Sequence, residues 1–400
     1  MKRLFLFIIS LVLLQSRVVA ADTSAAVARL AEMGFQNVRV ANYDKGVVYA
    51  CFESSTYRGT FHGAAAALKE LSTIYPEIHE FKIMLLDDQT PRVALTANCY
   101  GTYWRVEGSY DLSELRTALE VKPKHNSSAG RVDLTFYPMF SWINHRFNQP
   151  FEYVLSIAPA LQTSLWPGNR IILQPVIPIS YDVETINSES YVHIGVANVA
   201  QDFTSRSGRL FGTVAGGFFL YDRWGFDVRL GYHVSPLLSL SAEASITGTA
   251  VVNEGHYDIN ALKKFSAFLK ADYYHPATHL QGQLQAGRFV FGDYGVRADI
   301  SRHFGDYTIG LYGVYTDGEH NAGFHFAIPF GPRHQGGKGK FRLRMPDYFD
   351  WEYSMVSYYE YYDQQMGRTV EIRPDENRSA HYWQPAHVAQ YTQKVLNGEL

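Results

Sequence analysis

Beyond its first 20 residues, the sequence lacks any long hydrophobic run. No stretch of about 18 apolar residues follows, so a transmembrane helix is not expected. Charged residues are scarce at 19 %, and the formal net charge of −3 argues against a nucleic-acid partner, which would require a clustered basic face. Cysteine is nearly absent, because Cys51 and Cys99 are the only two. In an oxidising compartment they could form one disulfide bond, and the alternative is two separate buried thiols.

Aromatic residues and glycine are abundant instead. The chain contains 28 Tyr, 25 Phe and 32 Gly among its 400 residues. Many aromatics and glycines without a long apolar run are typical of sheets whose alternate side chains face lipid. The N-terminus also has the layout of a secretory signal peptide: Met1-Lys2-Arg3 is basic, residues 4–14 are mostly apolar, and Val18-Val19-Ala20 resembles the small-residue region before a cleavage site. We therefore expect residues 1–20 to be a signal peptide and the protein to be exported.

Residues 21–122 alternate between helical and strand patterns. Helices are expected at 24–33, 61–75 and 111–119, and strands at 36–41, 46–53, 80–86 and 92–106. This order predicts one compact α/β domain of ordinary size. Both cysteines fall in strands, where a cross-strand bridge is geometrically possible. Residues 123–130 are polar and small, and we interpret them as a linker.

The pattern changes from residue 131 to residue 332, where apolar residues alternate with polar or small ones. Residues 224–233 are the clearest case, with apolar Trp224, Phe226 and Val228 on one side and Asp227 and Arg229 on the other. About twelve such segments can be counted. They begin near Val132, Phe151, Arg170, Tyr191, Leu210, Trp224, Leu238, Phe265, Leu280, Asp293, Tyr307 and Ala322. The expected fold is a transmembrane antiparallel β-barrel of about twelve strands, preceded by the small periplasmic α/β domain.

A soluble β-sandwich is the rival fold, because its strands also alternate. These strands are long for a sandwich, in which about 5 to 6 residues are usual. Their polar side also carries charges of both signs, which could satisfy one another inside a closed barrel. The candidate lumen-facing residues are Asp227, Arg229, Lys270, Asp272, Gln281, Gln283, Gln285, Arg297 and Asp299. They could line a path for sugars, or form a network that fills a narrow barrel.

Residues 323–330 alternate aromatics and end on Phe330, like the terminal-strand signal by which outer-membrane barrels reach the barrel-assembly machinery. An aromatic and acidic tail, residues 333–400, follows this signal. The tail could stack on sugar rings, or it could serve for packing or as an extra strand pair with an interfacial belt.

Three stretches resemble the YjbH-type proteins, which are related to the capsule protein GfcD. They are Leu-Ala-Glu-Met-Gly-Phe-Gln-Asn-Val-Arg-Val at residues 30–40, Cys-Phe-Glu-Ser-Ser-Thr-Tyr-Arg at 51–58, and Ala-Ala-Leu-Lys-Glu-Leu at 66–71. The resemblance implies an outer-membrane barrel that takes part in exopolysaccharide or capsule export or assembly, with polysaccharide or the periplasmic export machinery as partners. It brings no catalytic residues. The chain is shorter than larger family members and has room for one barrel.

An outer-membrane enzyme acting on lipid or glycan at the barrel rim is the alternative function. Ser301 with His303, and Ser235 with His233, are the close pairs that a nucleophile site could use. We expect no catalytic site, no cofactor and no metal, because neither the histidine spacing nor the glycine-rich segment fits a known kind of site. A structural membrane anchor without a passage is the third candidate.

Overall fold

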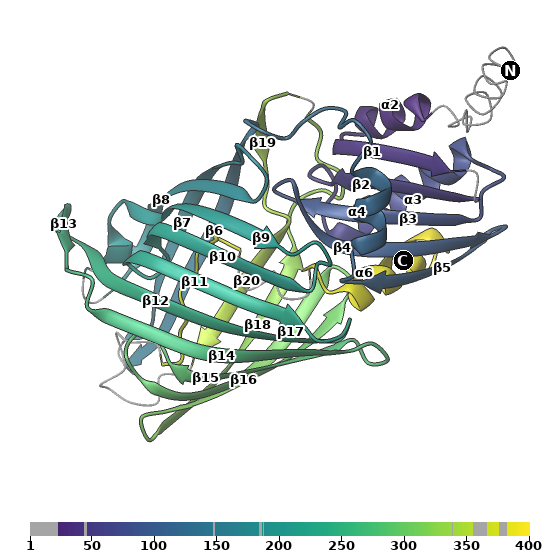
Figure 1. Ribbon diagram of the computed structural model, residues 1–400. Helices are drawn as coiled ribbons and strands as arrows, with labels where there is room; N and C mark the ends of the chain where they lie inside the picture. The colour runs from purple at the N-terminus through teal and green to yellow at the C-terminus, as the bar shows by residue number, and fades with distance from the viewer. Residues whose placement is uncertain are drawn as a thin grey trace, which may run out of the picture.

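The computed structural model describes residues 23–43, 46–146, 149–183, 186, 188–337, 339–354, 366–375 and 382–400. The predicted signal peptide, residues 1–20, lies outside the described residues, as does the aromatic run at 358–362. Among the described helices, none has the length and apolar character that crossing a membrane would need. Strands dominate the described chain, and they form one sheet of 5 and one of 15 strands. Figure 1 shows the small sheet beside one end of the large one.

The small sheet has the order β1-β2-β3-β4-β5, and only the β2–β3 pair is parallel. Its strands are β1 (Gln36–Tyr43), β2 (Val47–Glu53), β3 (Glu80–Asp87), β4 (Thr90–Tyr100) and β5 (Tyr103–Ser109). The single strand expected at 92–106 is instead the β4–β5 hairpin, which reverses at Gly101 with a φ of +70°. This left-handed backbone suits glycine, which has no Cβ.

Helices cover both faces of the small sheet. Helix α2 (Ser24–Glu32) and helix α3 (Thr60–Ile74) pack on one face, where Leu30, Leu68 and Leu71 join the larger apolar core. Helix α4 (Ser113–Leu119) packs on the other face through Leu115 and Leu119. Strand side chains point alternately to the two faces, so each strand contributes to both cores.

The two cysteines are free thiols, so of the two alternatives left open by the sequence the disulfide is not formed, although Cys99 is only partly buried. Cys51 on β2 belongs to the core under α4, whereas Cys99 on β4 packs against the core on the opposite face. Strand β3 also separates their two strands. A cross-strand disulfide needs neighbouring side chains on one face, and this pair meets neither condition.

The twelve strands expected between residues 131 and 332 all form, within three residues of their predicted starts. Among the described residues they run antiparallel to their chain neighbours. They are β6 (Val132–Arg146), β7 (Gln149–Thr163), β8 (Asn169–Asp182), β9 (His193–Thr204), β10 (Leu210–Phe219), β11 (Arg223–His233), β12 (Leu238–Asn253), β14 (Lys264–His275), β15 (Leu280–Arg288), β16 (Tyr294–Phe304), β17 (Tyr307–Thr316) and β18 (Glu319–Pro329). A short 3₁₀ turn, η1 (Ser188–Ser190), precedes β9, and the short strand β13 (His256–Ile259) pairs only with β12.

The large sheet exposes its apolar side chains and buries its polar ones. On β11, Phe226, Val228 and Leu230 are 57 %, 47 % and 48 % exposed, whereas Asp227 is fully buried. Exposed apolar residues recur on the strands that follow, among them Leu269 and Leu311. A sheet in a water-soluble protein has the opposite arrangement. Figure 1 shows the sheet curled, with one face turned inward, and we call this its concave face.

The tail adds two strands to the large sheet. Strand β19 (Phe341–Arg344) pairs in parallel with the start of β6, and β20 (Tyr348–Ser354) pairs with β18. Strand β18, which carries the predicted terminal-strand signal, therefore lies between β17 and β20 rather than at the sheet's end. Strand β20 also approaches β6, because the indole N–H of Trp351 on β20 donates to the carbonyl oxygen of Phe140 on β6 at 2.8 Å. No strand ladder joins β20 to β6 in the described part of the chain.

The chain ends in helix α6 (Pro385–Leu396), which packs on the small sheet rather than on the large one. Val388 and Tyr391 are buried in the core that α2 and α3 also cover. The backbone N–H of Val106 on edge strand β5 donates to Gln393 Oε1 at 3.0 Å. The sequence pattern did not predict this helix, whose packing partners lie some 290 residues earlier in the chain.

Candidate functional site

The nine candidate residues all lie on the concave face of the large sheet. The register shows this, because directly opposed residues of antiparallel strands share a face. Asp272 faces Gln283, which faces Asp299; Lys270 faces Gln285, which faces Arg297. Gln281 lies two residues from Gln283, and Asp227 lies two from Arg229 on the buried side of β11. Period-two patterns thus identified the face of each candidate.

Arg229 is the centre of one charge cluster on this face. Its Nε lies 2.7 Å from Asp227 Oδ2 and 3.2 Å from Glu243 Oε2 on β12. Its Nη2 donates to the carbonyl oxygen of Val370 at 2.6 Å. One guanidinium thus joins two strands to the tail and is ion-paired with two carboxylates of the sheet.

Asp272 is held by neutral amides instead. Gln281 and Gln283 each donate from Nε2 to its Oδ2 at 2.7 Å. Gln281 is in turn bonded through Oε1 to His303 Nε2 at 2.9 Å. Each amide therefore donates a hydrogen bond to the Asp272 carboxylate and holds it against the concave face.

Two arginines share the carboxylate of Glu352 on β20. Arg297 Nη2 lies 2.7 Å from Glu352 Oε2, and Arg368 Nη1 lies 3.2 Å from Oε1. The Arg297 guanidinium also lies 4.0 Å from the centre of the Tyr312 ring, and that of Arg368 lies 4.7 Å from the Tyr221 ring, both in cation–π geometry. Arg368 belongs to the tail, so this cluster also ties the tail to the sheet.

A tail segment, residues 366–373, crosses the concave face from β16 toward β9, and we call it the crossing segment. Gly367 N donates to Asp293 Oδ2 at 2.9 Å, and Asn198 Nδ2 on β9 donates to the carbonyl oxygen of Ile372 at 2.9 Å. Between these points Val370 and Ile372 pack on apolar residues of the same face. Two of the candidates, Arg229 and Arg297, are therefore linked to this segment, directly through Val370 and through Glu352 with Arg368.

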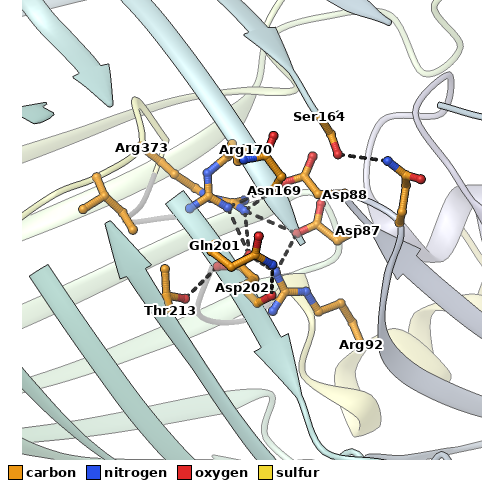
Figure 2. A network of polar contacts seen from close by, with 12 residues as sticks. Asp87, Asp88, Arg92, Ser164, Asn169, Arg170, Gln201, Asp202, Thr213 and Arg373 are labelled. Atoms are coloured by element: carbon orange, nitrogen blue, oxygen red, sulfur yellow. Dashed lines mark hydrogen bonds and ion pairs between the residues drawn. The ribbon is translucent and has the colours of Figure 1, made fainter. Parts of the chain in front are cut away.

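A second charge network joins the small sheet to the end of the large one (Figure 2). Asp202 on β9 lies at its centre. Arg92 on β4 is ion-paired to Asp202 Oδ2, Arg170 Nη1 on β8 lies 3.1 Å from it, and Arg373 Nη2 lies 3.6 Å from it. Thr213 Oγ1 donates to the other carboxylate oxygen at 2.7 Å. Four separate chain segments thus converge on one buried carboxylate.

Asp87, the last residue of β3, and Asp88, in the turn that follows, complete this junction. Carboxylate oxygens of Asp87, Asp88 and Asp202 lie within 4.8 Å of one another, a spacing that could hold a metal ion. Arg373 Nη2, however, lies 3.4 Å from Asp87 and 3.5 Å from Asp88. Burial and the neighbouring Asp87 raise the pKa of Asp88 to about 7, while the arginines oppose that shift. The guanidinium groups of Arg92, Arg170 and Arg373 therefore lie against these three carboxylates and offset their charge.

The serine–histidine pairs do not form nucleophile sites. His303 bonds through Nδ1 to Thr308 Oγ1 at 2.9 Å, and His233 Nδ1 bonds to Ser239 rather than to Ser235. Ser301 lies 3.4 Å from His325 Nε2, but that same nitrogen lies 2.9 Å from Asp299 Oδ2. A triad needs the serine and the acid at opposite ring nitrogens.

Several residues of these networks were missed at the level of sequence. Glu243 and Glu352 follow the same period-two alternation as the predicted candidates, so the pattern could have found them. Arg368 and Arg373 belong to a segment without regular structure, where no periodic signal exists. No family model and no curated protein matches the chain, so its function has to be inferred from its own residues.

Proposed function

We propose that the chain is a non-enzymatic outer-membrane β-barrel protein that takes part in exopolysaccharide or capsule export or assembly, with the small α/β domain in the periplasm. The observation that carries the proposal is the inverted alternation of the large sheet, with apolar side chains exposed and charged ones buried. Leu269, Ile300 and Leu311 are each more than 60 % exposed. This arrangement is favourable when lipid surrounds the exposed apolar face.

Energetics favour lipid over water at this surface. Apolar surface costs about 25 cal/mol per Å² when water covers it, and soluble monomers rarely expose patches above a few hundred Å². The exposed apolar residues extend over strands from β7 to β18. The twelve long strands between β6 and β18 have 9 to 16 residues, which suits a tilted membrane crossing that needs about 9–11.

Closure of the sheet is part of the proposal. Backbone N–H and C=O groups cannot stay unpaired in lipid, so a membrane sheet must close on itself. The hydrogen bond from Trp351 to Phe140 brings β20, one end strand of the sheet, close to β6, the strand next to the other end, and the ring centres of these residues lie 6.2 Å apart. In a membrane, β20 and β6 would complete the wall.

The polysaccharide role rests on the resemblance of residues 30–40, 51–58 and 66–71 to the YjbH-type proteins. In this proposal the small domain docks periplasmic export partners and the barrel anchors them. A structural anchor without a passage is the second candidate, and the crossing segment favours it because that segment occupies the concave face. Releasing the crossing segment from the concave face would therefore distinguish an export path from a structural anchor.

Two adjacent substitutions on β15 test the membrane proposal. Leu284 is 51 % exposed and Gln283 faces Asp272 and Asp299 on the concave side. Leu284→Lys should cost about 2–4 kcal/mol in lipid, whereas the same change on a wet surface costs almost nothing. Gln283→Lys is the matched control and should fold normally, because two carboxylates surround it.

The readouts are outer-membrane fractionation and heat-modifiable gel mobility of the detergent-folded protein. We expect the wild type and Gln283→Lys to run faster unboiled, and Leu284→Lys to lose this folded band. Equal folding of both variants together with a soluble wild type would refute the barrel. Loss of exported polysaccharide from cells without the protein, with restoration by the wild-type chain, tests the export role.

A further inference from the structure

Two cations from distant parts of the chain meet at the turn between β14 and β15. Lys394, in the last turn of α6, lies with its Nζ 3.3 Å from His279 Nε2 in that turn. The same ammonium lies 4.7 Å from the centre of the Tyr391 ring. Arg302 on β16 is directly opposed to Leu280, the residue that follows His279. Burial and the positive charges of Lys394 and Arg302 all lower the pKa of His279, so both cations act on one imidazole.

His279 stays neutral and accepts a hydrogen bond from Lys394. An ammonium group only donates, so Nε2 of His279 is the acceptor and its proton is on Nδ1. That Nδ1 lies 3.1 Å from the Tyr274 hydroxyl, which donates to Gln390 Oε1 at 3.4 Å. The ammonium keeps two further N–H groups, and these have no partner in the described chain.

No carboxylate of the described chain is ion-paired with either cation. The acidic residues nearest to Arg302 in the sequence have other partners. Asp299 Oδ2 lies 2.9 Å from His325 Nε2 on the concave face, and Asp306 Oδ2 lies 2.8 Å from Arg58 Nη2. The two positive charges therefore lack a counter-charge within the chain, and together they attract an anion.

Arg302 lies on the exposed, apolar face of the large sheet. Its neighbours on that face, Ile300 and Phe304, are 61 % and 47 % exposed, and its guanidinium lies 4.9 Å from the centre of the Phe304 ring. Helix α6 adjoins this end of β16, because the Tyr391 hydroxyl donates to the carbonyl oxygen of His303 at 3.1 Å (Figure 1). An arginine at the end of an apolar stripe is typical of a membrane boundary, where its stem lies in lipid and its charge among head groups.

We propose that Arg302 and Lys394 bind the phosphate group of an anionic phospholipid at the periplasmic surface of the membrane. Guanidinium and ammonium groups donate charge-assisted hydrogen bonds to phosphate oxygens. The acyl chains would lie along Ile300 and Phe304. A zwitterionic choline lipid fits less well, because it brings a third positive charge to a place that already has two. The bound lipid would connect α6 of the small domain to β16 of the barrel.

This inference deepens the proposed function, on which it rests for the membrane and for the orientation of the small domain. Native mass spectrometry of the full-length, detergent-folded protein tests it with phosphatidylglycerol and phosphatidylcholine of equal acyl chains. We expect phosphatidylglycerol to bind about fivefold more tightly. Glycerol 1-phosphate has the same phosphate without acyl chains and should bind about a hundredfold more weakly than the lipid. Equal affinity for the two lipids, or glycerol 1-phosphate binding as tightly as phosphatidylglycerol, overturns the proposal.

Substitutions connect this preference to the two cations. Arg302→Gln and Lys394→Gln should each weaken phosphatidylglycerol binding about fivefold, and the double variant about twentyfold, with phosphatidylcholine binding unchanged. Arg288→Gln is the matched control, because Arg288 lies at the other end of the same face, with its guanidinium 5.3 Å from the Tyr294 ring centre. It should bind like the wild type. Wild-type affinity in the double variant, or an equal loss in Arg288→Gln, overturns the assignment to this site.

The outcomes separate this inference from the proposed function. Heat-modifiable mobility of each sample reports the folded barrel independently of lipid preference. A heat-modifiable protein without a preference for phosphatidylglycerol overturns the lipid site and leaves the barrel standing. A protein that stays soluble with one mobility overturns the barrel, and the lipid site falls with it.

Discussion

Arg229 on β11 donates a hydrogen bond to the carbonyl oxygen of Val370 at 2.6 Å, across 141 residues of sequence. Asp227 and Glu243 hold the guanidinium from the side of the sheet. The crossing segment is therefore fixed by the same charges that line the concave face. Substitutions that remove these charges should loosen the crossing segment more than the strands. The backbone hydrogen bonds between the strands do not involve these side chains.

Replacement of Arg368 should loosen the crossing segment. Arg368→Ala removes one of the two cations at Glu352, and loss of a buried ion-pair partner costs about 3 kcal/mol. In the proposed barrel the conductance in planar lipid bilayers should then rise. Arg209→Ala, in the exposed turn before β10, is the control and should conduct like the wild type. Unchanged conductance in Arg368→Ala would assign the segment a purely structural role.

The junction at Asp88 should weaken as the pH rises. Its pKa is about 7 in the folded protein, above the usual value of 3.8, so the folded state binds more protons than the unfolded state between these values. Stability contributed by the protonated form is present below pH 4 and is lost as the pH rises through 7. Asp88→Asn cannot ionise, and at pH 8 it should be more stable than the wild type by on the order of 2 kcal/mol.

Urea unfolding in detergent at pH 4.5, 6 and 8 measures this difference. Asp111→Asn is a control of opposite sign, because hydrogen bonds from Ser113 lower the pKa of Asp111. The stability that Asp111 contributes is present above its unfolded pKa and is lost on acidification. If Asp88→Asn is no more stable than the wild type at pH 8, the protonated carboxyl has no role at the junction.

The two thiols should differ in their reactivity toward maleimide, and they should not form a disulfide bond with each other. Cys51 is 2 % exposed, and burial raises its pKa to about 11, so it should resist a maleimide at pH 7. Cys99 is only partly buried and should react first. Mass spectrometry should therefore find one label on the folded protein and two after denaturation. Two labels on the folded protein, or none in denaturant without reductant, contradict the free, unequal thiols.

Loss of packing under α6 should destabilise the small sheet. Val388 is fully buried, and Val388→Ala should cost about 2 kcal/mol through lost apolar burial and the cavity it leaves. Hydrogen exchange of Trp104 and Val106 on β5 should accelerate, because α6 covers this edge and its end provides their acceptors. Glu399→Ala lies on the exposed end of the chain and should leave this exchange unchanged.

Local patterns predicted the parts of the fold that depend on local chemistry. Alternation over ten residues, as at Trp224 to His233, fixes both the strand and the face of Asp227 and Arg229. The same rule failed for the Cys51–Cys99 pair, because alternation does not say which strands become neighbours. The bond from Val106 to Gln393 joins residues 287 apart, and no pattern near either residue signals it.

Helix α6 also fixes an order of assembly. The core around Leu68 includes Val388 and Tyr391, which lie more than 300 residues later in the chain. The small sheet cannot complete this core until the twelve residues of α6 have been synthesised. Contacts across such a sequence separation form slowly, so the small sheet should gain its full core late in folding.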